Sequence, residues 1–243
     1  MTNNEKIRRL IEDTGKHYNE IIFEDDFIPS KVYLHQISLR DRIIENLLGE
    51  QNFTVVLDLG CGTGFHQETL SRYAGRLIGA DMSFGALKVC KRNFSGEYIV
   101  CDVNQLPFKN NSIDLIWIAG VLHHVPDRLP PVIKNITSIL RPGGVLLVDE
   151  PNKLNPLNYF ILKFSKADPT GSERSLSSAS IKKLFRDCHL KILSSDWYEF
   201  LSPFGLMTGN DHIFRLCERG DALLGRSFIR PFLLRWTIHA IKE

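Results

Sequence analysis

The stretch VVLDLGCGTG, from Val55 to Gly64, decides the fold of this 243-residue chain. Its valines and leucines predict a short buried strand, and its three glycines predict a tight turn directly after that strand. Glycines in such a turn let the backbone come close to a ligand, because they carry no Cβ atom. The question is which ligand suits a turn that has Asp58 just ahead of its first glycine.

The glycine spacing disfavours a dinucleotide. Dinucleotide folds use G-x-G-x-x-G, whose third glycine allows close helix packing while the helix N-terminus receives the pyrophosphate. Here the glycines are Gly60, Gly62 and Gly64, and Phe65 occupies the place of that third glycine. The carboxylate of Asp58 would also repel a phosphate. A dinucleotide-dependent oxidoreductase is therefore a disfavoured alternative.

S-adenosylmethionine suits the same turn, because it carries no phosphate and presents an α-ammonium group that Asp58 can attract. Asp81, which ends the next predicted strand, lies where nucleotide-binding βαβ units place the acidic residue that binds ribose hydroxyls. Asp102 follows the third predicted strand and can accept from the adenine amino group, while the backbone N–H of Val103 donates to the ring. These positions together favour S-adenosylmethionine as the ligand.

The rest of the chain alternates apolar runs with amphipathic segments, which is typical of a parallel sheet covered by helices. Strands are predicted at residues 54–59, 76–81, 97–102, 113–120, 144–150, 189–200 and 235–241. Helices are predicted at 31–48, 67–73, 84–94, 130–140 and 179–187, the fourth of them ending before the sequence RPGG. Residues 151–180 and 202–231 interrupt this alternation and are interpreted as insertions, the second with helical apolar spacing.

Four stretches carry a family resemblance, in the order VLDLGCGTG, GADMS, CDVNQLPFKNNSIDLIWIAGVLHHVPD and LRPGGVLLVDEPN. They resemble the successive motifs of class I S-adenosylmethionine-dependent methyltransferases, in particular the small-molecule branch that includes quinone- and sterol-methylating enzymes. The resemblance covers about residues 53–152. It implies a Rossmann-like, doubly wound α/β sheet of seven strands, mostly parallel with an antiparallel last strand, and helices on both faces.

The resemblance also implies the cofactor site position by position. It assigns the methionine end to Asp58 and the three glycines of the turn, the ribose to Asp81, and the adenine to Asp102 and Val103. The residues expected to contact S-adenosylmethionine are Asp58, Gly60, Cys61, Gly62, Thr63, Gly64, Asp81, Met82, Asp102, Val103 and Gly120. We expect no metal ion in this site.

The length and the 43% hydrophobic content favour one methyltransferase domain over residues 1–243. Within it, residues 1–50 are expected to form an N-terminal helical cap and residues 53–150 the cofactor-binding core. The segments 151–180 and 202–231 are expected to shape the substrate site. Tyr18 and Tyr33 are candidates for a lid over the cofactor, with a plain packing role favoured.

His123 and His124 follow the fourth predicted strand and Glu150 ends the fifth, so all three are expected at the carboxyl edge of the sheet. Methyl transfer needs a base only when the acceptor is a hydroxyl or an acidic carbon, and these side chains are the candidate catalytic groups. The favoured alternative for the histidines is that one supports the cofactor loop and the other packs. Asp149 and Glu150 are the alternative base or substrate-orienting pair, and for them the favoured alternative is hydrogen bonding to the backbone of the PNKLNP turn.

Two apolar segments, PLNYFILKF at residues 156–164 and the predicted helix from Ile213 to Leu224, are candidates to roof the substrate crevice. In that case polar substitution of Phe214 and Leu216 should raise the Michaelis constant of the acceptor. Contact with a membrane surface is an alternative, because arginines accompany the apolar residues, but an ordinary surface helix is favoured. These arginines are Arg215, Arg219, Arg226 and Arg230.

Composition restricts the partners. The net charge of +2 is too mild for a nucleic-acid-binding surface, and five cysteines without a closely spaced pair favour a reducing cytoplasm. No apolar run approaches the ~18 residues of a membrane helix, although peripheral membrane contact stays open. We expect a cytoplasmic enzyme that methylates a small, apolar or glycosyl-bearing metabolite. The sequence assigns it no oligomeric state. The alternative is a catalytically silent module that binds S-adenosylmethionine or S-adenosylhomocysteine.

Overall fold

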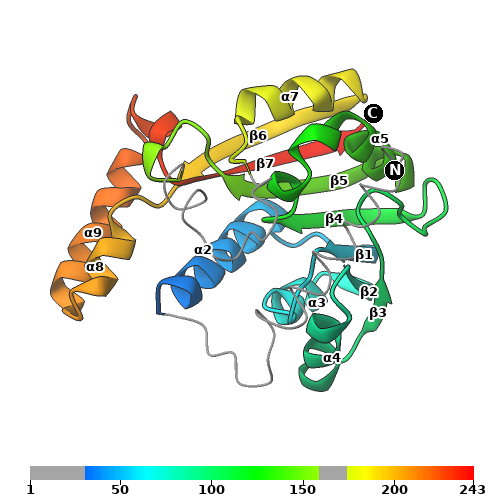
Figure 1. Cartoon of the computed structure of the whole chain (residues 1–243), viewed down its shortest axis with the longest axis horizontal. Helices are drawn as coiled ribbons and strands as arrows, with labels where there is room; N and C mark the ends of the chain where they lie inside the picture. Colours follow the sequence, from blue (N-terminus) through cyan, green and yellow to red (C-terminus); the bar gives the residue numbers. More distant parts are fainter. Residues whose placement is uncertain (1–30, 159–173) are drawn as a thin grey trace, which may run out of the picture.

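A computed structural model describes residues 31–158 and 174–243. These residues form a seven-stranded sheet in the order β3-β2-β1-β4-β5-β7-β6 (Figure 1). Its strands are β1 Phe53–Leu59, β2 Ala74–Asp81, β3 Glu97–Val100, β4 Ile113–Ala119, β5 Leu140–Pro151, β6 Leu190–Tyr198 and β7 Arg235–Lys242. The last strand, β7, lies between β5 and β6 and is antiparallel to both, whereas the pairs formed by the first five strands are parallel. The predicted doubly wound sheet is confirmed.

Helices cover both faces of the sheet (Figure 1). On one face, Ile44 and Leu48 of α2 (Lys31–Leu48) pack with Leu70 of α3 (Gln67–Ser71) against Leu115 and Trp117 of β4. The other face is covered by α5 (Leu129–Ile139) and α7 (Ser178–Asp187), whose apolar residues share a core with the alternate side chains of β1, β4 and β5. The helix α4 (Phe84–Asn93) packs against β2 and β3. This two-sided burial is why the central strands consist of nearly continuous apolar runs.

The boundaries differ from the prediction at one informative place. The sequence RPGG was expected to separate a helix from a strand that begins at Gly144, but β5 already begins at Leu140. Leu140 pairs with Ile113, and the register then shifts before Leu115 pairs with Val145. The irregular pairing accommodates Pro142 and its neighbouring glycines without ending the strand.

The segment after β6 is helical, as its apolar spacing indicated. The helices α8 (Ser202–Met207) and α9 (Asp211–Leu224) pack on each other and project from the end of β6, and the short turn η4 (Arg230–Phe232) leads into β7 (Figure 1). None of the helices in the described ranges is both long and apolar enough to span a bilayer.

Some predictions fall on other parts of the chain. Residues 1–30, which include Tyr18 and most of the predicted cap, and residues 159–173, which include most of PLNYFILKF, lie outside the described residues. The division of the chain into cap, core and insertions therefore stays a prediction.

Candidate cofactor and active site

The glycine turn follows β1 and adopts backbone conformations that favour glycine. The φ angles of Gly60, Gly62 and Gly64 are +82°, +53° and +94°. A Cβ atom on Gly60 would lie 2.1 Å from Cγ2 of Val121, and one on Gly64 would lie 2.6 Å from Sγ of Cys90. Two of the three glycines are thus required where the turn packs against the loop after β4 and against α4.

Asp81, at the end of β2, holds the same turn. One of its carboxylate oxygens accepts from the backbone N–H of Gly62 at 2.9 Å and the other from that of Ser83 at 2.8 Å. Burial raises the pKa of Asp81, and these hydrogen bonds oppose the rise. Each oxygen of a carboxylate has a second lone pair, so Asp81 retains acceptors for ribose hydroxyls.

Asp102 is arranged in a similar way after β3. Its Oδ1 accepts from the backbone N–H of Asn104 at 2.9 Å and from the side-chain amide of Asn104 at 2.8 Å. This turn fixes the carboxyl group and leaves Oδ2 without a hydrogen bond to any residue within the described ranges. The geometry suits the predicted contact with an amino group.

Asp58 gives the strongest indication of the ligand. It is buried, and Nε2 of Gln67 donates to its Oδ2 at 2.6 Å. Burial raises the pKa of Asp58 against this hydrogen bond, and together with the nearby carboxylates of Asp81 and Asp41 it brings the pKa to about 7. No lysine or arginine in the described part of the chain forms an ion pair with it. A buried acidic group without a cationic partner suits a ligand that brings its own cations, as the ammonium and sulfonium of S-adenosylmethionine do, and it opposes a pyrophosphate.

The remaining predicted cofactor positions have distinct surroundings. The thiol of Cys61 contacts Cys90, and this hydrogen bond together with burial raises the pKa of Cys61 well above its usual range. Val103 is part of the apolar core. Gly120 has a φ angle of +67°, and its N–H donates to the carbonyl of Asp149. Thr63 is buried and Met82 half-buried. For Cys61 and Val103 the backbone is therefore the part available to a ligand, and all these contacts stay predictions.

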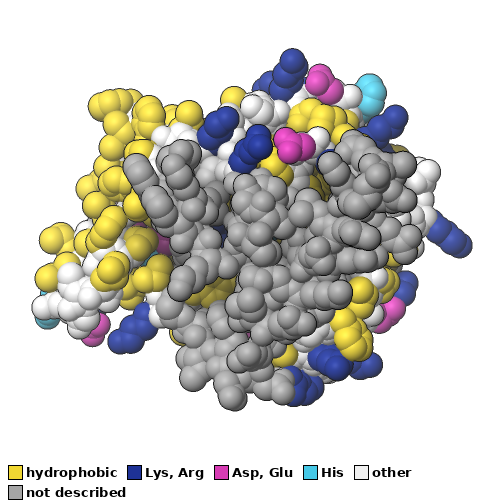
Figure 2. Space-filling view, in the orientation of Figure 1, with side chains coloured by type: hydrophobic (Ala, Val, Ile, Leu, Met, Phe, Trp, Pro, Cys, Tyr) yellow, Lys and Arg dark blue, Asp and Glu magenta, His cyan; other side chains and the backbone are white. Residues whose placement is uncertain are grey.

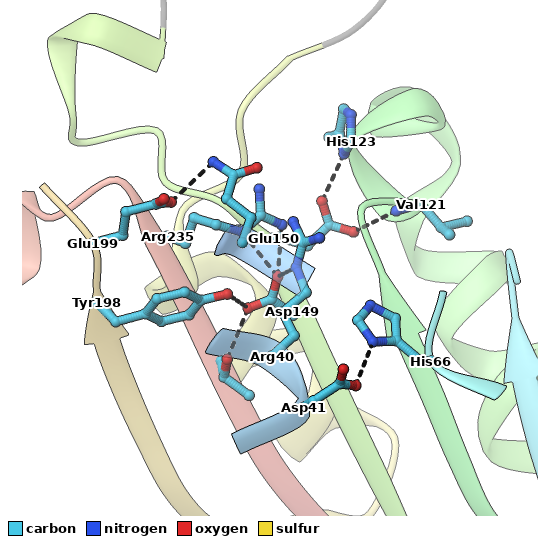
Figure 3. Close-up of polar contacts among 12 residues, drawn as sticks. Arg40, Asp41, His66, Val121, His123, Asp149, Glu150, Tyr198, Glu199 and Arg235 are labelled. Atoms are coloured by element: carbon cyan, nitrogen blue, oxygen red, sulfur yellow. Dashed lines mark hydrogen bonds and ion pairs between the residues drawn. The ribbon is translucent and has the colours of Figure 1, made fainter. Parts of the chain in front are cut away.

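Glu150 holds the loop after β4. Its Oε1 accepts from the backbone N–H groups of Val121 at 2.9 Å and Leu122 at 2.6 Å, and its Oε2 lies 2.7 Å from Nδ1 of His123 (Figure 3). Glu150 is fully buried, and the loop begins the short helix η2 (Leu122–His124). The carboxylate reaches the loop after β4 rather than the PNKLNP turn, so the favoured alternative for Glu150 was wrong about its partner.

The two histidines differ in burial. His123 is buried beside Glu150, whereas His124 is half-buried, and their ring centroids lie 4.1 Å apart. This arrangement is what loop support by His123 requires. The role of His124 as a general base stays a prediction.

Asp149 is an anchor and not a base. Arg40 of α2 and Arg235 of β7 donate to its Oδ1 through Nε at 2.9 Å, and Tyr198 and Thr237 donate to its Oδ2 at 2.5 and 2.8 Å (Figure 3). Burial alone would raise the pKa of Asp149, but the two arginines lower it to about 2. The carboxylate is therefore ionised in the neutral range and joins four elements.

The PNKLNP turn is held by its own asparagines instead. The side-chain amide of Asn152 donates to the carbonyls of Pro231 and Leu233, and that of Asn155 donates to the carbonyl of Phe232. These bonds tie the turn to the segment before β7.

Sequence reasoning missed several polar residues at this edge. Nδ1 of His66 lies 2.9 Å from Oδ1 of Asp41, and burial lowers the pKa of His66 (Figure 3). Glu199 follows β6 with a φ angle of +63° and is 1% exposed. Its Oε2 accepts from Gln36, its Oε1 has no partner in the described residues, and burial raises its pKa to about 7. The available signal was position, because Glu199 follows a strand parallel to β5.

A cavity of about 560 Å³ adjoins this group, between α2, the end of β6 and α9. Tyr198 and Glu199 line the cavity on one side. Across it, Nη2 of Arg42 lies 3.6 Å from Oε1 of Glu218. The cavity thus places the acidic end of β6 next to the projecting helices.

Comparisons with known proteins agree with this geometry. Residues 57–148 match the family model described as a methyltransferase domain. Demethylmenaquinone methyltransferase from Staphylococcus aureus is 29% identical over 158 residues, which are 62% of this chain and 62% of that protein. The chain thus aligns with about three fifths of the length of the curated relatives it matches.

Solved structures show the same fold. A SAM-dependent methyltransferase from Archaeoglobus fulgidus superposes with a TM-score of 0.64 at 18% identity, covering 86% of this chain and 94% of that one. Geranyl diphosphate C-methyltransferase from Streptomyces coelicolor superposes with a TM-score of 0.65 at 14% identity, covering 96% and 98%. Residues 57–148 thus match a methyltransferase domain, and the chain shares the fold of solved S-adenosylmethionine-dependent methyltransferases.

Proposed function

We propose that this chain transfers a methyl group from S-adenosylmethionine to a small-molecule acceptor with an apolar body. The observation that carries the proposal is the buried carboxyl group of Asp58 with its raised pKa, next to a glycine turn that Asp81 holds in place. When bound, S-adenosylmethionine supplies a methyl group already activated by a sulfonium. The protein therefore has to bind, align and exclude water, and alignment alone is worth ~7–11 kcal/mol in favourable cases.

The residues divide this work. Asp58 is suited to hold the ammonium, Asp81 the ribose hydroxyls, and Asp102 the adenine amino group. Glu150 fixes the loop after β4 by accepting from two backbone N–H groups. His124 at the end of that loop is the candidate base for an acceptor that must lose a proton. Because the carboxylate of Glu150 is bonded to the loop and to His123, we assign it a positioning role.

A small-molecule acceptor is supported by the relatives. The names of the Staphylococcus aureus and Streptomyces coelicolor proteins give demethylmenaquinone and geranyl diphosphate as the molecules that they methylate. The weak positive net charge of this chain also favours such an acceptor over nucleic acid. The cytoplasmic location and the absence of a nucleic-acid partner stay predictions.

The test is a calorimetric titration of the full chain with S-adenosylhomocysteine and, separately, with NAD. We expect binding of S-adenosylhomocysteine alone, weakened at least roughly tenfold in Asp81→Ala because charge-assisted hydrogen bonds to the ribose are lost. Asp81→Asn, which keeps one acceptor oxygen for the turn, guards against a folding defect. Glu97→Ala is the matched control, since Glu97 is an acidic residue of neighbouring β3 that pairs with Arg76 at the surface.

Two outcomes would contradict the proposal. A folded protein that fails to bind S-adenosylhomocysteine, or that prefers NAD, removes the cofactor assignment. Binding without incorporation of labelled methyl into any of a panel of apolar acceptors favours the catalytically silent module.

A further inference from the structure

Large apolar side chains are concentrated on the outer surface of α8, α9 and the turn that follows. Twelve large apolar side chains are exposed in the described ranges, and seven of them lie between Phe204 and Phe232. We call these seven the α8–α9 patch: Phe204, Met207, Ile213, Leu216, Leu223, Phe228 and Phe232. Figure 2 shows hydrophobic side chains gathered on the left of the molecule, where Figure 1 places α8 and α9. Such a concentration marks an interaction surface.

The side chains of the α8–α9 patch do not form the contact between α8 and α9. The helix α9 packs on α8 through its inner face, where Phe214 and Cys217 lie so close to Gly205 that a Cβ atom there would clash. Leu216 and Leu223 are 68% and 71% exposed, and no residue of α9 is buried. Because these two leucines are seven residues apart, they share one face of the helix. The expectation that Leu216 roofs the substrate crevice stays a prediction.

Basic side chains accompany the patch. Arg215 and Arg219 are exposed and four residues apart, so they form a row beside the leucines, on the side of α9 that also lines the cavity. Arg226 is exposed just beyond the helix. Two of the three acidic residues of α9 have partners elsewhere, and the third, Asp211, is exposed in the first turn of the helix. Asp221 accepts from the backbone N–H groups of residues 200–202, and Glu218 faces Arg42 across the cavity.

We propose that the α8–α9 patch docks the protein on an anionic lipid membrane. Apolar side chains beside arginines are the composition of helices that lie in the membrane interface, where the apolar groups enter the acyl boundary and the arginines bind lipid headgroups. A second copy of the chain is a poorer occupant. A two-fold contact through this face would set the arginines of one copy against those of the other. The inference goes beyond methyl transfer and does not depend on it.

The experiment is co-flotation of the full chain with vesicles. One set contains phosphatidylcholine, and the other contains phosphatidylcholine with about one quarter phosphatidylglycerol. We expect binding to the anionic vesicles that falls with added salt, and weaker binding to the neutral ones. Replacing Leu216 and Leu223 by serine should lower the partition coefficient at least roughly tenfold. Replacing Arg215 and Arg219 by glutamine should lower it roughly fivefold for each arginine.

Matched controls lie far from the patch. Val100→Ser removes a 53% exposed apolar side chain on β3, at the opposite edge of the sheet, and Lys109→Gln removes an exposed positive charge. Both should bind vesicles like the original protein. All substituted side chains are exposed, so unchanged melting curves are expected.

Three results would overturn the proposal. They are failure to bind either vesicle, binding that the patch variants leave unchanged, and a dimer in light scattering that the patch variants dissociate. The last result would assign the face to a second copy. Titration of the same preparations with S-adenosylhomocysteine reports the cofactor pocket, so a failure of the proposed enzymatic function is seen separately.

Discussion

Replacing Asp149 by asparagine should destabilise the protein by about 3 kcal/mol with little change in side-chain volume. Asp149 is fully buried and receives hydrogen bonds from Arg40, Arg235, Tyr198 and Thr237. An asparagine leaves the two arginines buried without their counterion, and breaking such a pair from one side costs about 3–5 kcal/mol.

We expect a loss of stability at the lower end of that range because Glu199 can replace part of the missing negative charge. Asp149 is one of the groups that raise the pKa of Glu199 to about 7, behind burial, while Arg235 and Arg40 lower it. When the charge of Asp149 is removed, the pKa of Glu199 falls, and the ionised carboxylate compensates part of the positive charge. We therefore expect about 3 kcal/mol at neutral pH and a larger loss in the double variant with Glu199→Gln.

The assay is equilibrium unfolding in urea at neutral pH, with Asp114→Asn as the matched control. Asp114 is also a buried residue of the sheet, and its carboxylate accepts from the backbone N–H of Val55 at 2.8 Å. The side chain of its ion-pair partner Arg141, however, is 42% exposed. We expect about 1 kcal/mol for that variant, because an exposed arginine remains solvated. A loss for Asp149→Asn no larger than for Asp114→Asn would refute the reasoning.

Acid gives an independent check with a defined sign. The folded-state pKa of Asp149 is about 2, below the usual value of 3.8, so its ionisation stabilises the protein above about pH 4 and this contribution is lost as the pH falls toward 2. The loss is about 2 kcal/mol. The stability difference between the original protein and Asp149→Asn should narrow by that amount over this window. The difference is the useful quantity, because the other carboxyl groups titrate in both proteins.

Two further substitutions test the loops of the site. Gly60→Ala should destabilise the protein by about 1–3 kcal/mol more than Gly143→Ala in urea unfolding. Both glycines have a positive φ angle, but a Cβ at Gly60 would lie 2.1 Å from Val121, whereas a Cβ at Gly143 has nothing within 4 Å. Equal losses would show that backbone strain dominates. Glu150→Gln should speed amide hydrogen exchange at Val121 and Leu122 roughly tenfold or more, because charge-assisted hydrogen bonds are lost. The amides of β1 and β2 serve as internal controls. Unchanged exchange would show that Glu150 does not position the loop.

The order of strands and helices was predictable because each apolar run has the length and the boundaries that its element needs. Lys31–Leu48 was predicted to the residue, since its apolar side chains repeat at helical spacing and Gly49 follows. The start of β5 was missed because proline and glycine normally interrupt a strand, whereas pairing of Leu140 with Ile113 depends on the neighbouring strand. The sequence of one segment indicates its own structural preference, whereas a register shift depends on both paired strands.

The candidate site was predictable at its strand ends and not at its partners. The acidic residues near the carboxyl ends of β1, β2 and β3 were found because parallel strands bring these ends to one edge of the sheet. The pairs Arg40–Asp149 and Asp41–His66 join residues 109 and 25 positions apart. They depend on how α2 crosses that edge. The periodicity of α2 identifies its buried face but not the polar groups that it meets.

The partners, rather than the positions, separate the roles of these carboxylates. Asp149 has two arginines and a pKa of about 2, so its charge is already used by the protein. Asp81 and Glu150 accept from backbone N–H groups and hold loops. Asp58 has an amide partner, a pKa of about 7 and no arginine or lysine pairing with it in the described ranges. A carboxylate kept buried without a cation costs free energy that a positively charged ligand recovers on binding, which is why Asp58 indicates the cofactor more strongly than the glycine turn does.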